Sequence, residues 1–179
     1  MKKMILLMSV FVGFIFAQST GMSTAKGESG MGLWFNHGVY QLDNDDYEGD
    51  WEVGFDYMTS MGLEVGVNMW DGAKGLELGY HHKMEKCNLN FSWSRAMWDD
   101  VDVDSDNLWF KLYCDSGLYG GLGGWSWNIG GESTDWEFDM LTFGKLWTLD
   151  MGMTVGVSYN ANTEYLDMGV IEFDLGYNF

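Results

Sequence analysis

An acidic stretch near the middle of the chain is the first place where residue type and spacing could support chemistry. Aspartates recur there at every second position, and carboxylate oxygens that converge on one ion bind calcium or magnesium. The spacing departs from a complete calcium loop, because Ser105 stands where a glycine is required and Lys111 where a glutamate is required. We therefore expect a solvated loop without a cofactor, and weak binding of Ca²⁺ or Mg²⁺ is the alternative. The candidate ligands are Asp100, Asp102, Asp104 and Asp106.

Histidines are too few to suggest catalysis. The sequence has 3, at His37, His81 and His82, and none stands with a serine and an acid in an arrangement that indicates a nucleophilic triad. A metal cluster would also lack nitrogen ligands. We expect no enzymatic activity and no catalytic residues.

Charge and aromatic content exclude several classes of protein. Acids outnumber bases 27 to 9, and the net charge of −18 would repel nucleic-acid phosphates. Hydrophobic residues make up 46% of the chain and aromatic residues 17%, which excludes intrinsic disorder. A length of 179 residues suffices for one domain with its own core. We expect a folded, single-domain protein that binds no nucleic acid.

The first residues have the composition of a targeting segment. Lys2 and Lys3 precede an apolar run, and Ala17 offers a small residue before polar sequence begins. This order is typical of a cleaved secretory signal peptide, and the run is shorter than the ~20 residues of a membrane-spanning helix. The expected divisions are a signal peptide at 1–17, a flexible polar tail at 18–30 and one domain at 31–179.

Apolar and polar residues alternate with a period of two along most of the remaining chain. Leu89, Phe91 and Trp93, for example, alternate with asparagine and serine. Such alternation predicts strands with one apolar and one polar face, and no segment shows a sustained helical period. Turn residues divide the chain into about ten strands, and merging an uncertain pair would leave eight. The strands are expected near 31–41, 48–58, 61–70, 75–83, 87–95, 107–114, 118–128, 136–146, 150–159 and 168–179.

The connections between these strands differ in length by parity. Those that follow even-numbered strands are short, such as 59–60 and 115–117. Those that follow odd-numbered strands are mostly longer and more acidic, such as 96–106. Short turns on one rim and longer loops on the other are typical of a transmembrane β-barrel. The predicted fold class is therefore all-β, an antiparallel up-and-down transmembrane barrel.

Three features indicate that the apolar face of this barrel is the outer one. The polar face contains glycine, asparagine, serine, threonine and a few acids, whereas the surface of a soluble barrel would be rich in lysine. Glycine recurs on that face, where small side chains suit a crowded interior. Aromatic residues concentrate near strand ends, as in the girdles at membrane interfaces. They include Trp51, Tyr57, Trp70, Tyr80, Trp93, Trp109, Trp147, Tyr159 and Tyr177.

The end of the sequence carries the most specific pattern. Alternate residues of the last strand are apolar or aromatic, and the final residue is a phenylalanine. This strand resembles the C-terminal recognition strand of bacterial outer-membrane β-barrel proteins, and the architecture resembles their small opacity-protein, OmpA and OmpX type. The resemblance implies an outer-membrane location, contact with outer-membrane lipids, recognition by the barrel-assembly machinery, extracellular longer loops and a periplasmic C-terminus. The assembly signal would be Phe173, Leu175, Tyr177 and Phe179.

Acidic residues dominate the predicted interior. Two carboxylates ~6 Å apart repel by roughly 3 kcal/mol at an effective dielectric constant near 20, so the interior needs water or cations. One interpretation is a narrow path that prefers cations. The other is a closed plug, because side chains fill barrels of about eight strands, whereas wide porin channels need 16–18. The expected lining is Glu52, Asp56, Glu64, Glu77, His81, Lys111, Glu172 and Asp174, with Glu137, Asp139 and Lys145 as further members.

The two cysteines support a specific prediction about pairing. Cys87 opens one predicted strand, Cys114 closes the next, and both fall on the apolar face. If these strands pair symmetrically about residues 100 and 101, the cysteines lie opposite each other. Directly opposed residues are within reach of a disulfide, and an exported protein meets an oxidising compartment. We therefore expect the pair to be able to form a disulfide.

Three functions stay open at this point. The first is an integral outer-membrane barrel with a structural or surface-interaction role, or with a narrow cation-preferring pore. The second is a secreted ligand carrier, because Gly32-Leu33-Trp34 resembles the Gly-x-Trp motif of lipocalins. The third is a lipid-modifying outer-membrane enzyme, to which the few histidines lend little support. No surface partner is indicated by the sequence.

Overall fold

A computed structural model describes residues 28–42, 44, 47, 49–70, 72–98 and 101–179. The predicted signal peptide and most of the predicted polar tail lie outside the described residues. No helix in the described part is long and apolar enough to cross a membrane.

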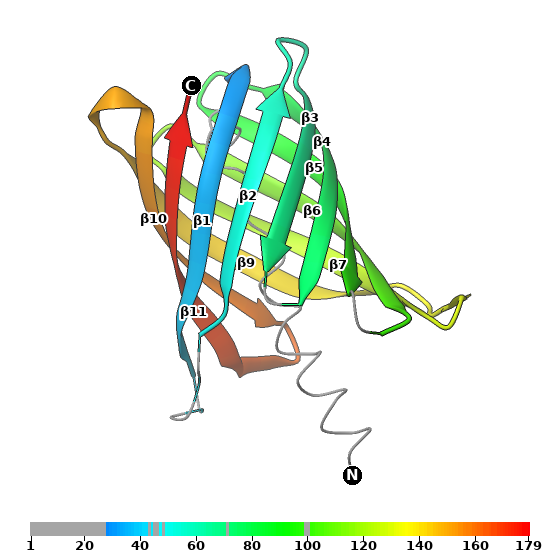
Figure 1. Cartoon of the computed structure of the whole chain (residues 1–179). Coiled ribbons are helices and arrows are strands. Elements are labelled where there is room, and N and C mark those ends of the chain that lie inside the picture. The colour runs from blue at the N-terminus through cyan, green and yellow to red at the C-terminus, as the bar shows by residue number, and fades with distance from the viewer. Residues whose placement is uncertain (1–27, 43, 45–46, 48, 71, 99–100) are drawn as a thin grey trace.

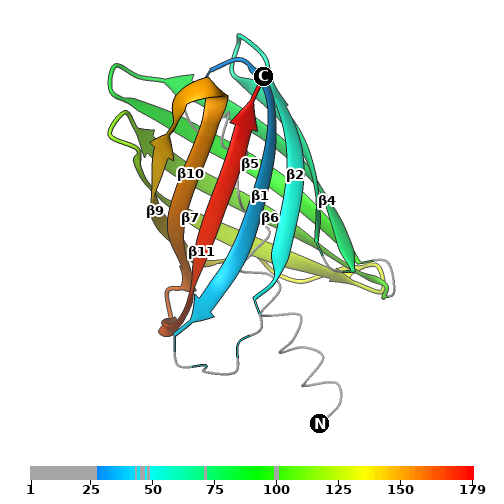
Figure 2. The same cartoon turned by 60° about the vertical axis from the view of Figure 1, so that its left-hand side comes forward.

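Ten long antiparallel strands in the described part of the chain close into one barrel (Figures 1 and 2). Each strand pairs with its neighbours along the chain, β1 with β11 completes the circle, and the two-residue strand β8 extends β7 as a short hairpin arm. The predicted fold class is confirmed, with ten strands in the wall. The strands are β1 (Gly30–Gln41), β2 (Trp51–Met58), β3 (Leu63–Trp70), β4 (Ala73–Lys83), β5 (Cys87–Trp98), β6 (Val103–Cys114), β7 (Leu118–Ile129), β8 (Glu132–Ser133), β9 (Glu137–Thr148), β10 (Met153–Asn162) and β11 (Tyr165–Asn178).

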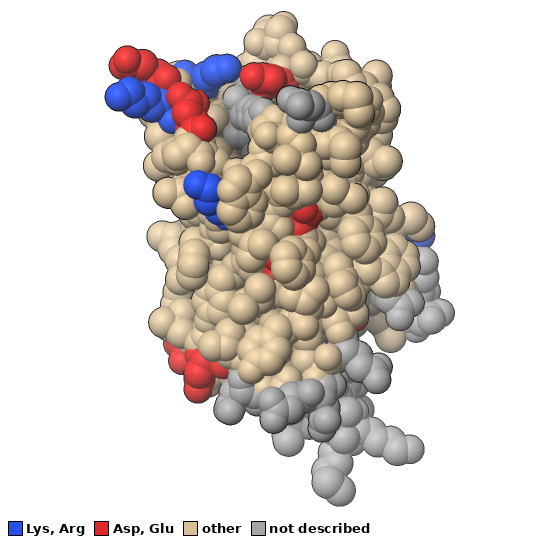
Figure 3. Space-filling model, turned by 90° about the vertical axis from the view of Figure 1, so that its left-hand side faces the viewer, with Lys and Arg blue, Asp and Glu red and all other residues tan. Residues whose placement is uncertain are grey.

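The burial of each strand is the reverse of that in a soluble protein. On β2 the side chain of Phe55 is 41% exposed, whereas its neighbour Asp56 is 1% exposed. Charged and amide side chains therefore face inward, and aliphatic and aromatic side chains face outward. On the face shown in Figure 3, charged side chains gather toward the two ends, with few in the broad band between them. This arrangement decides the orientation that alternation alone left open.

Two tryptophans that were expected in the outer girdles lie inside the barrel. Trp70 is 8% exposed and Trp109 is 3% exposed, so the prediction was wrong for both. Trp51 and Trp147 do face outward, at 43% and 45% exposure. The interior accepts the large rings because glycines stand beside them, as Gly123 does beside Trp109.

The two rims differ less in loop length than the sequence predicts. One rim, the short-turn rim, carries the connections 59–62, 84–86, 115–117 and 149–152 and the C-terminus (Figure 1). The opposite rim carries longer connections at 42–50 and 130–136. It also carries two connections that are only two residues long, 71–72 and 163–164. The predicted acidic loop is also shorter than expected, because β6 begins at Val103. Asp104 and Asp106 therefore stand on a strand.

An irregularity in β9 changes which of its residues face inward. Gly123 and Trp125 of β7 pair with Met140 and Glu137 of β9, so β9 has one extra residue at this point. A bulge of this kind switches the faces of the residues that precede it relative to those that follow. Glu137 is exposed, and Lys145 lies on the outer face with its Nζ 5.8 Å from the centre of the Trp147 ring. Both residues were expected inside; the prediction was wrong for Lys145, whereas Glu137 lies at the rim opposite Trp125.

Candidate functional site: the acidic interior of the barrel

The interior of the barrel holds a strongly unbalanced set of charged groups. Within the described residues, the inner face carries six buried carboxylates against one buried lysine, Lys111, and one histidine, His81. Each of these side chains belongs to a residue no more than 9% exposed. The six carboxylates are Glu52, Asp56, Glu64, Glu77, Glu172 and Asp174.

Asn36 lies among three of these carboxylates. On β1 it is the direct partner of Glu52 of β2 on one side and of Asp174 of β11 on the other. Its Nδ2 donates hydrogen bonds of 2.8 Å to Asp174 Oδ1 and to Glu172 Oε2. Glu172 is opposite Gly38, which has no side chain to fill the wall at that point. One amide thus organises an acidic patch that spans three adjacent strands.

Each carboxylate of this patch keeps one oxygen without a hydrogen-bond donor among the described residues. Asn68 donates to the other oxygen of Glu52. A buried carboxylate oxygen without a donor is costly unless water or a cation compensates it. The patch around Asn36 is therefore a part of the interior where water or a cation would compensate buried carboxylate oxygens. The oxygens are Glu52 Oε2, Glu172 Oε1 and Asp174 Oδ2.

His81 is the centre of a second polar group, on β3, β4 and β5. Its Nε2 is 2.7 Å from Glu64 Oε2 and 2.8 Å from Asn90 Nδ2, and its Nδ1 is 2.7 Å from Asn88 Nδ2. With Asn88 as donor, Nδ1 accepts and the Nε2–H group donates to Glu64. Both ring nitrogens are therefore engaged by protein groups, and this histidine holds the wall together rather than binding a metal.

Lys111 faces both groups from β6. The residue is 3% exposed, its Nζ is 5.1 Å from the centre of the Trp109 ring, and its charge interacts with Glu64, Glu77 and Asp174. Ser92 donates a hydrogen bond to Glu77. Within the described residues, one ammonium group therefore stands against six carboxyl groups in the interior.

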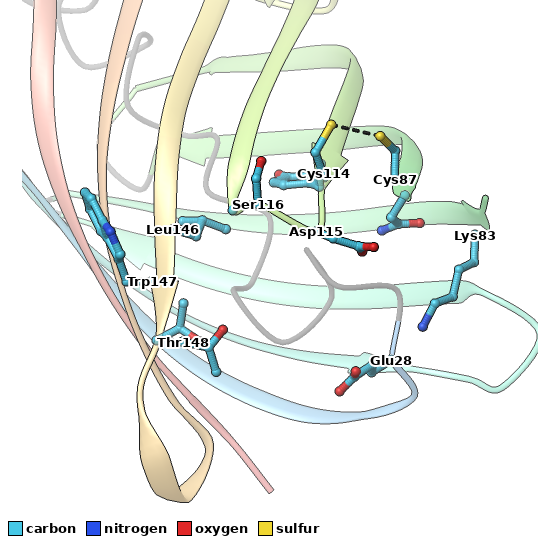
Figure 4. Close-up of a pocket in the computed structure, with 13 residues that line it drawn as sticks. Glu28, Lys83, Cys87, Cys114, Asp115, Ser116, Leu146, Trp147 and Thr148 are labelled. Carbon is cyan, nitrogen blue, oxygen red and sulfur yellow. Dashed lines mark hydrogen bonds between the residues drawn. The ribbon is translucent and has the colours of Figure 1, made fainter. Parts of the chain in front are cut away.

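Two cavities open at the short-turn rim. The larger, of about 440 Å³, is lined by inner-face side chains such as Asn88, Tyr113 and Thr154 and by rim residues such as Lys83 and Asp115 (Figure 4). The smaller, of about 340 Å³, is lined by the turn 59–62 and by His81. These two cavities are therefore polar openings that connect this rim with the interior of the barrel.

A chain of four tryptophans lies toward the opposite rim. The ring centres of Trp70 and Trp98 are 6.1 Å apart, those of Trp98 and Trp127 are 5.9 Å apart, and those of Trp127 and Trp125 are 5.8 Å apart. Trp125 Nε1 donates to Asp139 Oδ1 at 2.8 Å. These tryptophans were not predicted inside the barrel. The alternation in the sequence did indicate an inward position for Trp70, because Trp70 falls on the same strand face as the polar Asn68.

The predicted aspartate ligands do not form a common site in the described residues. Asp106 accepts hydrogen bonds from Arg95 Nε at 2.9 Å and from Arg95 Nη2 at 2.6 Å, and Asp102 is exposed at the rim. Asp104 is half-buried on the outer face, and Asp100 lies outside the described residues. No group of three or more histidine, cysteine, aspartate or glutamate side chains in the described part could hold a metal ion. Weak cation binding at this rim stays a prediction.

The cysteines and the C-terminal strand lie where the pattern placed them. Cys87 and Cys114 are direct partners across β5 and β6, and their Sγ atoms are 2.8 Å apart with both thiols free. The predicted assembly signal projects outward from β11, with Phe173 54% and Phe179 67% exposed, and Leu175 and Tyr177 face the same way. Whether this strand is read as a signal stays a prediction.

Comparison with known proteins gives fold-level likenesses at low identity. No protein-family model matches the chain, and no curated protein matches it. Among solved structures, the outer membrane protein Omp33 of Acinetobacter baumannii is 9% identical, with a TM-score of 0.38, over 85% of this chain and 99% of that one. OmpF of Salmonella typhi, in complex with daunomycin, is 12% identical, with a TM-score of 0.35, over 84% of this chain and 57% of that one. The attachment invasion locus protein Ail of Yersinia pestis is 14% identical, with a TM-score of 0.26, over 84% of this chain and 97% of that one.

Closure of the wall and the polarity of its two faces define the architecture of this molecule. The wall is closed and antiparallel, it leaves no free edge between β1 and β11 or between β6 and β7, and it is apolar outside and charged inside. The chain folds as a closed, ten-stranded antiparallel β-barrel whose outer face is apolar and whose inner face is charged.

Proposed function

We propose that this chain is an integral protein of the outer membrane whose interior admits small cations in preference to anions and excludes larger solutes. The membrane part of the proposal is supported by the outer face, where side chains such as Val67 and Phe91 are 53% and 52% exposed. Apolar surface of this extent would be unfavourable in water and is satisfied by lipid. Export by a cleaved signal peptide at 1–17 belongs to the same proposal.

The observation that carries the cation preference is the patch around Asn36. Glu172 and Asp174 share the amide of Asn36 there, Glu52 lies opposite the same residue, and each of the three keeps an oxygen that no described group satisfies. A permeating cation would supply the missing counter-charge, whereas an anion would meet the repulsion of all six inner carboxylates. Lys111 is the single described inner lysine that opposes this preference.

Barrel size limits what the interior could pass. A wall of ten strands lies just above the eight-strand size at which side chains fill the interior, and far below the ~16–18 strands of aqueous porins. The described carboxylates at mid-wall are covered by neighbouring side chains, so the interior has no room for solutes such as nutrients. The proposal therefore excludes a general porin role.

Two other functions receive less support. A secreted lipocalin-like carrier needs an apolar interior, whereas this interior contains charged and amide side chains. A lipid-modifying enzyme needs a general base beside a nucleophile, whereas both ring nitrogens of His81, the buried histidine of the described interior, are engaged by side chains of the wall. We propose no enzymatic activity. A structural or surface-interaction role is the fallback if the interior does not conduct.

The test is conductance of the purified, folded chain in a planar bilayer with a KCl gradient. We expect small, steady conductance with a reversal potential of the sign that indicates cation preference. The double substitution E52Q and E172Q should reduce that preference, whereas E85Q, in the turn 84–86, should leave it unchanged. Conductance no greater than that of protein-free bilayers would reject the cation path and leave a closed structural barrel.

A further inference from the structure

The cysteine pair occupies a defined place on the outer wall of the barrel. Cys87 is the first residue of β5 and Cys114 the last residue of β6, so the pair stands where both strands meet the short-turn rim. Figure 4 shows the two sulfur atoms pointing toward each other, and their Sγ atoms are 2.8 Å apart. The cavity of about 440 Å³ opens beside them, so the sulfurs are reached from the rim.

The backbone hydrogen bonds next to the pair identify the kind of site that it occupies. The amide of Asp115 donates to the carbonyl of Lys86 at 2.9 Å, which is the bond one residue outside the pair on both strands. In an antiparallel ladder, that pattern makes the enclosed residues a non-hydrogen-bonded pair. The Cα atoms of such a pair are ~4.5 Å apart, within the ~4.4–6.8 Å range of Cα distances in disulfides. Their side chains are also closer to each other than those of a hydrogen-bonded pair.

We propose that Cys87 and Cys114 form an intrachain disulfide that fastens β5 to β6 at the short-turn rim. The two thiols lose two protons and two electrons, and an S–S bond forms between the Sγ atoms. The electrons pass to a disulfide-bonded oxidant by thiol–disulfide exchange, so the oxidant's own disulfide is reduced to two thiols. The oxidising environment rests on the export that is part of the proposed function.

The bond would close the hairpin formed by β5 and β6 into a covalent ring. At the far end of this hairpin, Arg95 is already fixed to Asp106 by two hydrogen bonds. At the near end, two three-residue connections, 84–86 and 115–117, lead away from the cysteines. The disulfide therefore restrains the opposite end of the same hairpin.

The experiment is a peptide map of the full chain in which free thiols are trapped before any oxidation during isolation. Cells are quenched in acid and alkylated, the outer-membrane fraction is collected, and the protein is digested with trypsin without reductant. Cleavage after lysine and arginine gives one cysteine peptide at 87–95 and the other at 112–145. We expect these two peptides to be recovered joined, and to separate on addition of dithiothreitol.

Single-cysteine variants provide the matched control. In C87S and in C114S the joined peptide must disappear, and the remaining cysteine should become alkylated. Recovery of both peptides alkylated from the native chain in the outer-membrane fraction would overturn the disulfide and leave the outer-membrane proposal intact. Recovery of the chain only in the cytoplasm, with both thiols alkylated, would overturn the export on which the bond depends as well.

Discussion

Gly54 of β2 lies directly opposite Trp34 of β1, and the indole ring occupies the space that a Cβ on Gly54 would need. Trp34 is 4% exposed, so the ring cannot move outward without crossing the wall. The missing side chain at position 54 is therefore what allows a tryptophan inside a narrow barrel.

Substitution G54A should destabilise the folded barrel by about 1–3 kcal/mol, because the new methyl group overpacks the Trp34 ring. The matched control is G66A on β3, whose Cβ would stand 3.5 Å from the Cβ of Glu77, an ordinary contact. The temperature at which the folded band is lost on semi-native gels should fall for the first variant only. Equal temperatures for the two variants would contradict the close packing described here.

Substitution H81L should also destabilise the barrel, by about 1–3 kcal/mol, because Glu64 and Asn88 each lose a buried hydrogen-bond partner. The neighbouring His82 is exposed on the outer face, so H82L is the control and should unfold like the native chain. Unfolding by denaturant in detergent measures the stability of both variants. A loss of stability in H82L as large as that in H81L would show that the hydrogen-bonded group around His81 is not responsible.

Substitution K111M removes the one described lysine of the interior. It should cost about 3–5 kcal/mol in stability, because the inner carboxylates lose their buried counter-charge. If the barrel still folds, its reversal potential in a KCl gradient should shift further toward cation preference. The control is K145M on the outer face, which should leave the reversal potential unchanged. A native-like reversal potential in folded K111M would mean that Lys111 does not face the conducting path.

Removal of the Phe179 side chain should separate assembly in the cell from stability. The side chain is 67% exposed, and the residue is held to β1 by its backbone amide, which donates to the carbonyl of Met31 at 3.0 Å. We expect F179A to refold in detergent like the native chain, but to reach the outer membrane in smaller amounts. The control is F138A, whose side chain is 71% exposed on β9. Equal membrane yields for the two variants would count against a recognition signal in the last strand.

The local sequence pattern was sufficient to predict the strands of the wall and its two faces. Alternation of apolar and polar residues is a property of each strand alone, so it indicated the strands and the residues that share a face. The composition of the polar face then indicated that residues such as Glu52 and Asp174 point inward. The position of Cys87 opposite Cys114 also followed from the sequence, because one hairpin with a symmetrical centre sets the register of both strands.

Other features depended on pairing between strands that lie far apart in the sequence. The extra residue in β9 is defined only by its register against β7, and it decided that Lys145 faces outward although Glu137, of the same parity, pairs with Trp125. The three carboxylates around Asn36 come from β2 and β11, which meet only because β1 joins the two ends of the chain into a circle. The sequence by itself determined which residues face the interior along regular strands. Closure and register, which are non-local, decided which of them meet.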